Sequence, residues 1–341
     1  MIMSAKSFPR GRPFDPSAPG DAGPFIVYDE EFLQVLGPNP SLELIVATDA
    51  HEGPVYVRAE DALYFTTVPR NVNVPMPGYK TVAISRLDLA ADPPALSVVR
   101  EPSNMANGMT LGRDGNLIVC EQGTRSSPAA ISRLDPRSGA RESLVEQWFH
   151  LPFNSPNDVV VKSDGSIWFT DPSYGFLQGF KPEPVAGDFV YRFDPSSGSL
   201  AVVADRFNKP NGLAFSPDES ILYINDSAAI QGPGSYHPAL PHHILAFDVT
   251  DGAHLTNARL FAVVTPGIPD GLKVDSAGRV YSSAADGLKV YNPAGNLIGA
   301  IVVYNVANFA FGGKRLDTIF LLNDTAIYAA HLQARGAVPQ P

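Results

Sequence analysis

Hydrophobic and polar residues alternate in short runs along the whole chain, and the runs are separated by turns rich in Gly, Pro, Asn or Asp. Such alternation is typical of β-strands with one buried face, and Asp-Gly between two runs is typical of a hairpin. Four copies of one pattern align: an Asn or Asp, an apolar run, a turn and a second β-rich run. They begin at Ala106, Pro156, Pro210 and Pro269. The pattern predicts an all-β fold built from repeats.

Each repeat contains about four strands. Further short strands follow the hairpins, at Ile131, Phe189, Ile244 and Leu288. Degenerate copies of the unit precede and follow the four, which brings the number to six. Units of roughly 50 residues with four strands each predict a six-bladed β-propeller with four-stranded blades. An open β-solenoid or a pair of β-sandwiches is the alternative, and it fits this turn spacing less well.

The two ends of the chain carry separate predictions. A strand from Leu42 is expected to join the last blade and close the ring, and a helix is expected over residues 27–37. Residues 25–341 are predicted to form the single propeller domain. Residues 1–24, rich in Pro, Gly and Ser, are predicted to be a flexible N-terminal arm. The arm contains no apolar stretch of the kind found in secretory signals.

Charge, hydropathy and cysteine content exclude several kinds of binding partner and metal site. The 341 residues include 25 Lys and Arg against 35 Asp and Glu, a net charge of −10, which argues against nucleic-acid binding. Apolar runs are all shorter than the roughly 18–20 residues of a membrane span, so no membrane partner is expected. The single cysteine, Cys120, excludes an internal disulfide and a cysteine-based metal cluster. We therefore expect a cytoplasmic protein.

One polar position recurs just before the first strand of each repeat. In a propeller this strand lines the central channel, so equivalent residues from all blades meet at one end of the axis. The equivalent residues here are Glu52, Asn107, Asn157, Asn211 and Asp270. Asn and Asp before Gly are also ordinary turn residues. Their shared register nevertheless favours a common site, and carboxylate and amide oxygens are ligands for Ca²⁺, Mg²⁺ or Mn²⁺.

The same segments carry a family resemblance, from about Phe25 to Gly313. The chain resembles the gluconolactonase, regucalcin (senescence marker protein) and luciferin-regenerating enzyme family of six-bladed propellers. The resemblance rests on EGP at Glu52, PND at Pro156, PNGLAFSPDES at Pro210, PDGLKVDSAGRVY at Pro269 and FGG at Phe311. ANGMTLGRDGNLIVCE at Ala106 and FTDPSYG at Phe169 are more similar to the microbial and fungal lactonase branch than to the animal one.

The resemblance implies one divalent cation at the mouth of the channel, usually Ca²⁺, with Mg²⁺, Mn²⁺ or Zn²⁺ as alternatives. Glu52, Asn211 and Asp270 match the family's side-chain ligands. Asn157 would be a fourth ligand, or would hold substrate or water beside the metal. Asn107 would line the pocket.

The implied activity is metal-dependent opening of a small-molecule lactone or ester to a hydroxy acid. The cation would polarise the carbonyl, Asp270 would act as general base, and Asn157 would assist. Animal members of the family place an arginine that contacts the sugar lactone two residues before the Asn157 position, where this chain has Ser155. The metal site is unaffected by this difference, and the expected substrate is either a sugar lactone or a bulkier or aromatic lactone. The alternatives are phosphotriester or ester hydrolysis or a biosynthetic rearrangement at the same metal, and a calcium-binding propeller without activity.

Three long loops, after Val68, Asp171 and Asp226, are expected to form a rim on the metal side. Their aromatic and imidazole side chains are candidate substrate contacts and suggest a bulky or aromatic lactone. These candidates are Tyr174, Phe176, Tyr236, His237 and His242, accompanied by Tyr79, Phe180 and His243. The alternative is that each packs its own loop.

The histidines allow other readings that the sequence supports less well. The spacing of His237, His242 and His243 does not match a zinc finger. His51, next to Glu52, is either a proton shuttle or a packed or solvated residue. The second interpretation is favoured because adjacent strand residues point to opposite faces.

Two other enzyme classes have no motif in this sequence. The chain contains no G-x-S-x-G nucleophile motif and no phosphate-binding P-loop. No oligomeric state follows from the sequence.

Overall fold

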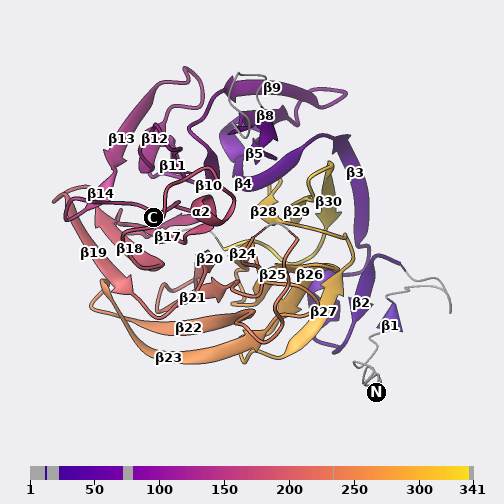
Figure 1. Cartoon of the computed structure of the whole chain (residues 1–341). Helices are drawn as coiled ribbons and strands as arrows, with labels where there is room; N and C mark the ends of the chain where they lie inside the picture. The colour runs from indigo at the N-terminus through magenta and orange to yellow at the C-terminus, as the bar shows by residue number, and fades with distance from the viewer. Residues whose placement is uncertain (1–11, 14–22, 72–79, 233, 338–341) are drawn as a thin grey trace.

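Six antiparallel sheets surround a common axis in the computed structural model, which describes residues 12–13, 23–71, 80–232 and 234–337 (Figure 1). The first strand of each sheet is innermost and contacts the first strands of its two neighbours. The predicted six-bladed β-propeller is therefore confirmed.

Blades one to three follow each other in chain order, each with its strands numbered from the axis outwards. Blade one comprises β4 (Ala50–Val57), β5 (Ala62–Thr67), β8 (Ile84–Asp88) and β9 (Ala95–Arg100). Blade two comprises β10 (Ala106–Leu111), β11 (Leu117–Glu121), β12 (Ala130–Leu134) and β13 (Arg141–Val145). Blade three comprises β16 (Val159–Val161), β17 (Ile167–Asp171), β18 (Phe189–Asp194) and β19 (Ser199–Ala204).

Blades four to six complete the ring. Blade four comprises β20 (Pro210–Phe215), β21 (Ile221–Asp226), β22 (His243–Thr250) and β23 (His254–Val263). Blade five comprises β24 (Leu272–Val274), β25 (Val280–Ala284), β26 (Gly287–Tyr291) and β27 (Leu297–Ile301). Blade six comprises β28 (Asn308–Gly312), β29 (Thr318–Leu322), β30 (Ala326–His331) and, from the start of the chain, β3 (Ser41–Ala47).

Strand β3 closes the ring, as the sequence predicts. It pairs antiparallel with β30, so that Leu42 lies opposite Ala330. A segment near the start of the chain thus completes the last blade and removes an open edge between the first and last repeats.

The N-terminal segments add to blade five. Strand β2 (Phe25–Val27) pairs with β27, and β1 (Arg12–Pro13) pairs with β2. The rest of the predicted flexible arm, up to residue 22, lies outside the described residues. The predicted helix exists but is shorter, α1 (Phe32–Leu36), because only Phe32, Val35 and Leu36 supply a buried face. Among the described residues, no helix combines the length and the apolar character needed to cross a membrane.

The remaining short elements lie in connections. They are the 3₁₀ turn η1 (Arg58–Glu60), the strand pairs β6 (Arg70–Asn71) with β7 (Lys80–Thr81) and β14 (Gln147–Trp148) with β15 (Leu151–Pro152), and helix α2 (Tyr174–Leu177).

Apolar side chains between adjacent blades form the core. Trp168 on β17 is fully buried and meets the Phe215 ring of the next blade edge-on, at 5.5 Å between centroids. Trp168 therefore belongs to the hydrophobic layer between blades three and four. Each blade face is therefore buried against its neighbour, which holds the inner strands in a fixed ring.

Glycines allow these inner strands to approach each other. Gly108 on β10 donates its N–H to the Asn157 carbonyl at 2.7 Å, and a Cβ at this position would lie 2.4 Å from the same oxygen. We expect Gly108→Ala to reduce the free energy of unfolding by about 3 kcal/mol, because backbone must move to relieve the overlap. Differential scanning calorimetry measures the change. Gly232→Ala, whose Cβ would meet nothing closer than 3.5 Å, is the matched control. Equal stability of the two variants would contradict the expectation.

Candidate functional site

The five predicted polar positions all lie where the chain enters an inner strand. Glu52, Asn107 and Asn211 lie near the starts of β4, β10 and β20, and Asn157 and Asp270 come two residues before β16 and β24. These inner strands run in the same direction around one axis. The five residues therefore occupy one end of the channel, and we call them the polar ring.

Backbone hydrogen bonds join neighbouring members of the ring. The Gly108 N–H reaches the Asn157 carbonyl, and the Gly212 N–H reaches the Asp270 carbonyl at 3.1 Å. In blade six the Gly271 N–H reaches the Ala307 carbonyl at 2.9 Å in the same way. Ala307 is thus the sixth equivalent position, and it contributes no polar side chain to the ring.

Blade six instead supplies Asn308, which the sequence analysis did not single out. Its amide donates to Glu52 Oε2 at 2.8 Å, and the Gly53 N–H donates to the same oxygen at 3.1 Å. Both Glu52 and Asn308 are buried. The Glu52 carboxylate is therefore held in one orientation at the axis. An Asn one position after the ring register is the signal that would have identified Asn308.

Two carboxylates share this end of the channel. Burial raises the pKa of Glu52, and the charge of Asp158 adds to the effect. Burial, together with the charge of Glu52, raises the pKa of Asp270 well above its usual range, whereas a hydrogen bond from the Asn211 side chain acts in the opposite direction. The like charges of the buried Glu52 and the half-buried Asp270 favour a positive partner between them.

Several oxygens near the ring have no hydrogen-bond partner among the described residues. They are buried Oδ1 atoms of Asn107, Asn157 and Asn225, and Oδ2 of Asp158. Leaving such atoms unsatisfied is costly. Two of them belong to the polar ring itself, where carboxylates already lie. This donor set, two carboxylates and several amide oxygens, fits a hard divalent cation such as Ca²⁺.

The described residues do not form a second kind of metal site, built mainly from nitrogen or sulfur ligands. Across the described part of the chain, no group of three or more His, Cys, Asp or Glu side chains is arranged to hold a metal. His237, His242 and His243 of blade four do not form such a group. The polar ring is not such a group, because three of its five side chains are amides.

His51 lies beside Glu52 and is fixed by the last blade. Its Nδ1 lies 2.6 Å from Asp324 Oδ1, and its side chain is 29% exposed. Burial disfavours its charge, but the hydrogen bond to Asp324 and the charge of Glu52 prevail and raise the pKa of His51 to about 9. The imidazole is thus a partly buried cation next to the ring, paired with a carboxylate 273 residues away.

Among the rim residues, Tyr174 reaches the ring. It is buried, its hydroxyl donates to the Ser227 carbonyl at 3.3 Å, and the same hydroxyl hydrogen-bonds the Asn211 side chain. Ser155 anchors this loop: its Oγ donates to the Pro172 carbonyl at 2.5 Å and accepts the Gly175 N–H at 2.9 Å. The serine that stands at the arginine position of animal relatives therefore positions α2 beside the ring.

The other rim candidates lie further out. Phe176 and Tyr236 are 42% and 48% exposed, and His237 is exposed. His242 Nδ1 pairs with the Leu240 carbonyl at 2.9 Å. Within the described ranges, no hydrogen bond or ion pair joins these four side chains to the ring. Phe180 packs against Val82 and Met105, and Tyr79 lies outside the described residues.

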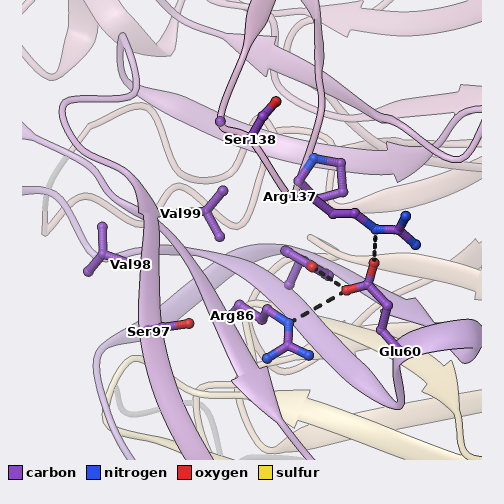
Figure 2. A pocket seen from close by; sticks show the side chains of 10 residues that line it. Glu60, Arg86, Ser97, Val98, Val99, Arg137 and Ser138 are labelled. Atoms are coloured by element: carbon purple, nitrogen blue, oxygen red, sulfur yellow. Dashed lines mark hydrogen bonds and ion pairs between the residues drawn. The ribbon is translucent and has the colours of Figure 1, made fainter.

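A separate cavity of about 520 Å³ lies between blades one and two (Figure 2). There Arg137 Nε and Arg86 Nε lie 3.3 and 3.6 Å from the two Glu60 oxygens, and the Tyr64 hydroxyl donates to Glu60 at 2.6 Å. Glu60 follows β4, at the end of that strand remote from Glu52. Both arginines of this cavity form ion pairs with Glu60. The cavity is therefore separate from the polar ring.

Comparisons with known proteins agree with this geometry. Residues 50–324 match the family model described as SMP-30/Gluconolactonase/LRE-like region. The chain is 30% identical to the lactonohydrolase oryL of Aspergillus oryzae (92% of this chain, 75% of the relative). It is 33% identical to the gluconolactonase of Zymomonas mobilis (81% and 77%). A solved gluconolactonase structure from Xanthomonas campestris superimposes with a TM-score of 0.74 at 31% identity, covering 95% of this chain and 99% of that one.

The match runs from β4 to just after β29 and includes all five positions of the polar ring. The resemblance drawn from the sequence motifs is confirmed. The chain belongs to the SMP-30/gluconolactonase/LRE-like family.

Proposed function

We propose that this protein is a lactonase that uses one divalent cation, Ca²⁺ by preference, held by Glu52, Asn157, Asn211 and Asp270. The observation that carries the proposal is the ring itself: the buried Glu52 and the half-buried Asp270 lie at one end of the channel, beside amide oxygens that have no hydrogen-bond partner among the described residues. The relatives that the chain resembles are named gluconolactonase and lactonohydrolase, which supports lactone opening as the reaction.

The cation, when bound, would polarise the lactone carbonyl and acidify a water molecule. Ca²⁺ accepts six to eight oxygen ligands in flexible geometry, which suits a mixture of carboxylates and amides. Mg²⁺ and Mn²⁺ share the preference for oxygen. Zn²⁺ fits less well, because nitrogen and sulfur ligands are lacking in the ring.

Asp270 is proposed as the general base. Its backbone is fixed by three contacts: its carbonyl accepts the Gly212 N–H and the Asn225 amide at 2.8 Å, and its N–H donates to Ser283 Oγ at 3.2 Å. Its carboxylate would take a proton from the attacking water as the new C–O bond forms. The ring C–O bond then breaks, and the leaving alkoxide takes up a proton to give the hydroxy acid.

Asn157 and Asn107 are proposed to orient substrate or water through amide groups whose oxygens face no protein donor among the described residues. Tyr174, held by the Ser155 anchor, forms the wall on the blade-three side and presents its hydroxyl at Asn211. Phe176, Tyr236, His237 and His242 would contact the outer part of a larger substrate. We therefore propose that lactones bulkier than a simple aldonolactone are accepted.

The test is proton release from a panel of γ- and δ-lactones, from gluconolactone to aromatic lactones, followed in a pH-stat with calcium-loaded protein. We expect turnover of at least one lactone, with kcat/KM highest for a substrate large enough to contact the rim. Hydrolysis of a phosphotriester with none of any lactone would contradict the proposal. Calcium binding without turnover of either class would indicate a binding protein instead.

A further inference from the structure

The opposite end of the channel forms a second cavity, of about 390 Å³, lined by all six inner strands. Its inner-strand walls come from residues two to four positions after the polar ring. At about 3.3 Å per residue, this places the cavity roughly 10 Å along the axis from the ring. Val55, Met109 and Ala310 are buried in it, and Leu111 is 39% exposed. The cavity is therefore a mostly apolar pocket with a mouth on the face away from the ring.

One charged residue, Lys273, lies among the inner-strand residues of this lining. The positions three residues after the ring are Val55, Thr110, Val160, Ala214, Lys273 and Ala310, and all six line the cavity. Lys273, from blade five, is the one charged side chain among these six positions. Lys273 is half-buried, and its ammonium makes no hydrogen bond or ion pair with any residue in the described ranges.

The other charges at the cavity leave it positive. Arg58, exposed after β4, likewise has no hydrogen-bond or ion-pair partner for its side chain within the described ranges. Glu219 is the acidic residue in the lining, and it is occupied by Lys162 at 3.1 Å and by the Ser163 N–H at 2.7 Å. Asp158 lies near enough for the charge of Lys273 to act on its carboxyl, but outside ion-pair distance. A pocket with excess positive charge is unusual in a chain of net charge −10.

We propose that this cavity binds a small apolar carboxylate, with its hydrocarbon part against the inner strands and its carboxylate at Lys273. An apolar pocket with a few convergent polar groups is the usual form of a small-molecule site. The unpaired ammonium selects an anion, and the surrounding Val, Met and Ala side chains select an apolar body. The site is independent of the ring, so it does not depend on the proposed reaction.

The test is isothermal titration calorimetry of the calcium-loaded full chain with octanoate and with octanol. We expect octanoate to bind the natural protein more tightly than octanol. Lys273→Met should weaken octanoate binding at least tenfold and leave octanol binding unchanged. Lys273→Arg should retain the preference for octanoate, and Lys314→Met, which removes an exposed lysine outside the cavity, should have no effect.

Lactone turnover separates this site from the ring. Saturating octanoate should leave the KM for lactone unchanged, because the two ligands occupy opposite ends of the channel. Competitive inhibition by octanoate would place it in the ring and overturn the proposal. Absence of octanoate binding, or equal binding by the natural protein and Lys273→Met, would also overturn it. The calorimetric results are obtained whether or not the protein proves to be a lactonase, since they measure binding directly.

Discussion

Asp270→Asn is expected to lower kcat for lactone hydrolysis by about 10³-fold or more, since it removes the proposed base and one of two charged ring ligands together. An amide of the same size has no comparable proton affinity and binds a divalent cation less strongly. The backbone of residue 270 should be unaffected, because the Gly212 N–H and the Asn225 amide bind its carbonyl and not its side chain. Steady-state kinetics at saturating calcium measure the change.

The matched control is Asp205→Asn, which removes an exposed carboxylate on the loop after β19. Its kcat should equal that of the natural protein. Circular dichroism and the thermal transition of both variants establish that the fold is retained. An Asp270→Asn variant that keeps more than a tenth of the natural kcat would remove Asp270 from the role of base.

Removal of the cation is expected to lower the thermal transition temperature. Glu52 is buried and Asp270 half-buried at the same end of the channel, and the charge of Glu52 raises the pKa of Asp270. A ligand at 100 times its Kd stabilises the folded state by about 2.7 kcal/mol. For a chain of 341 residues this corresponds to about 4 °C. Scanning calorimetry with calcium and with a chelator measures the shift.

Glu52→Gln provides the internal comparison. The amide can still accept the hydrogen bonds from Asn308 and Gly53, but the repulsion with Asp270 disappears. Without metal, the variant should be at least as stable as the natural protein. With calcium, it should gain little. An equal calcium-induced shift in the two proteins would show that Glu52 is not a ligand.

The ring positions could be predicted because they repeat in register. Asn107, Asn157, Asn211 and Asp270 each precede an apolar run that becomes an inner strand, and a shared register in the sequence becomes a shared height along the axis. The closing strand β3 was predictable for a similar reason, since the last repeat lacked an outer strand. Periodicity thus reports on contacts between equivalent positions.

Contacts between non-equivalent positions had no such signal. The Asn308 amide reaches Glu52 from one position outside the register, and His51 meets Asp324 from the far end of the chain. Lys273 lies three residues after Asp270 in a segment that the sequence analysis identified. That its ammonium has no partner among the described residues depends on the side chains that the other five blades place around it. Helix α2 has only four residues, too few for a helical period to appear in the sequence.

We propose that lactone opening requires one cation in the polar ring. The most direct measurement is to strip the protein of metal, titrate it with Ca²⁺, and follow metal binding and lactone turnover in the same samples. We predict one equivalent of Ca²⁺ per chain, with turnover restored in proportion to the bound metal and absent before the titration. Full turnover by the stripped protein would contradict the account.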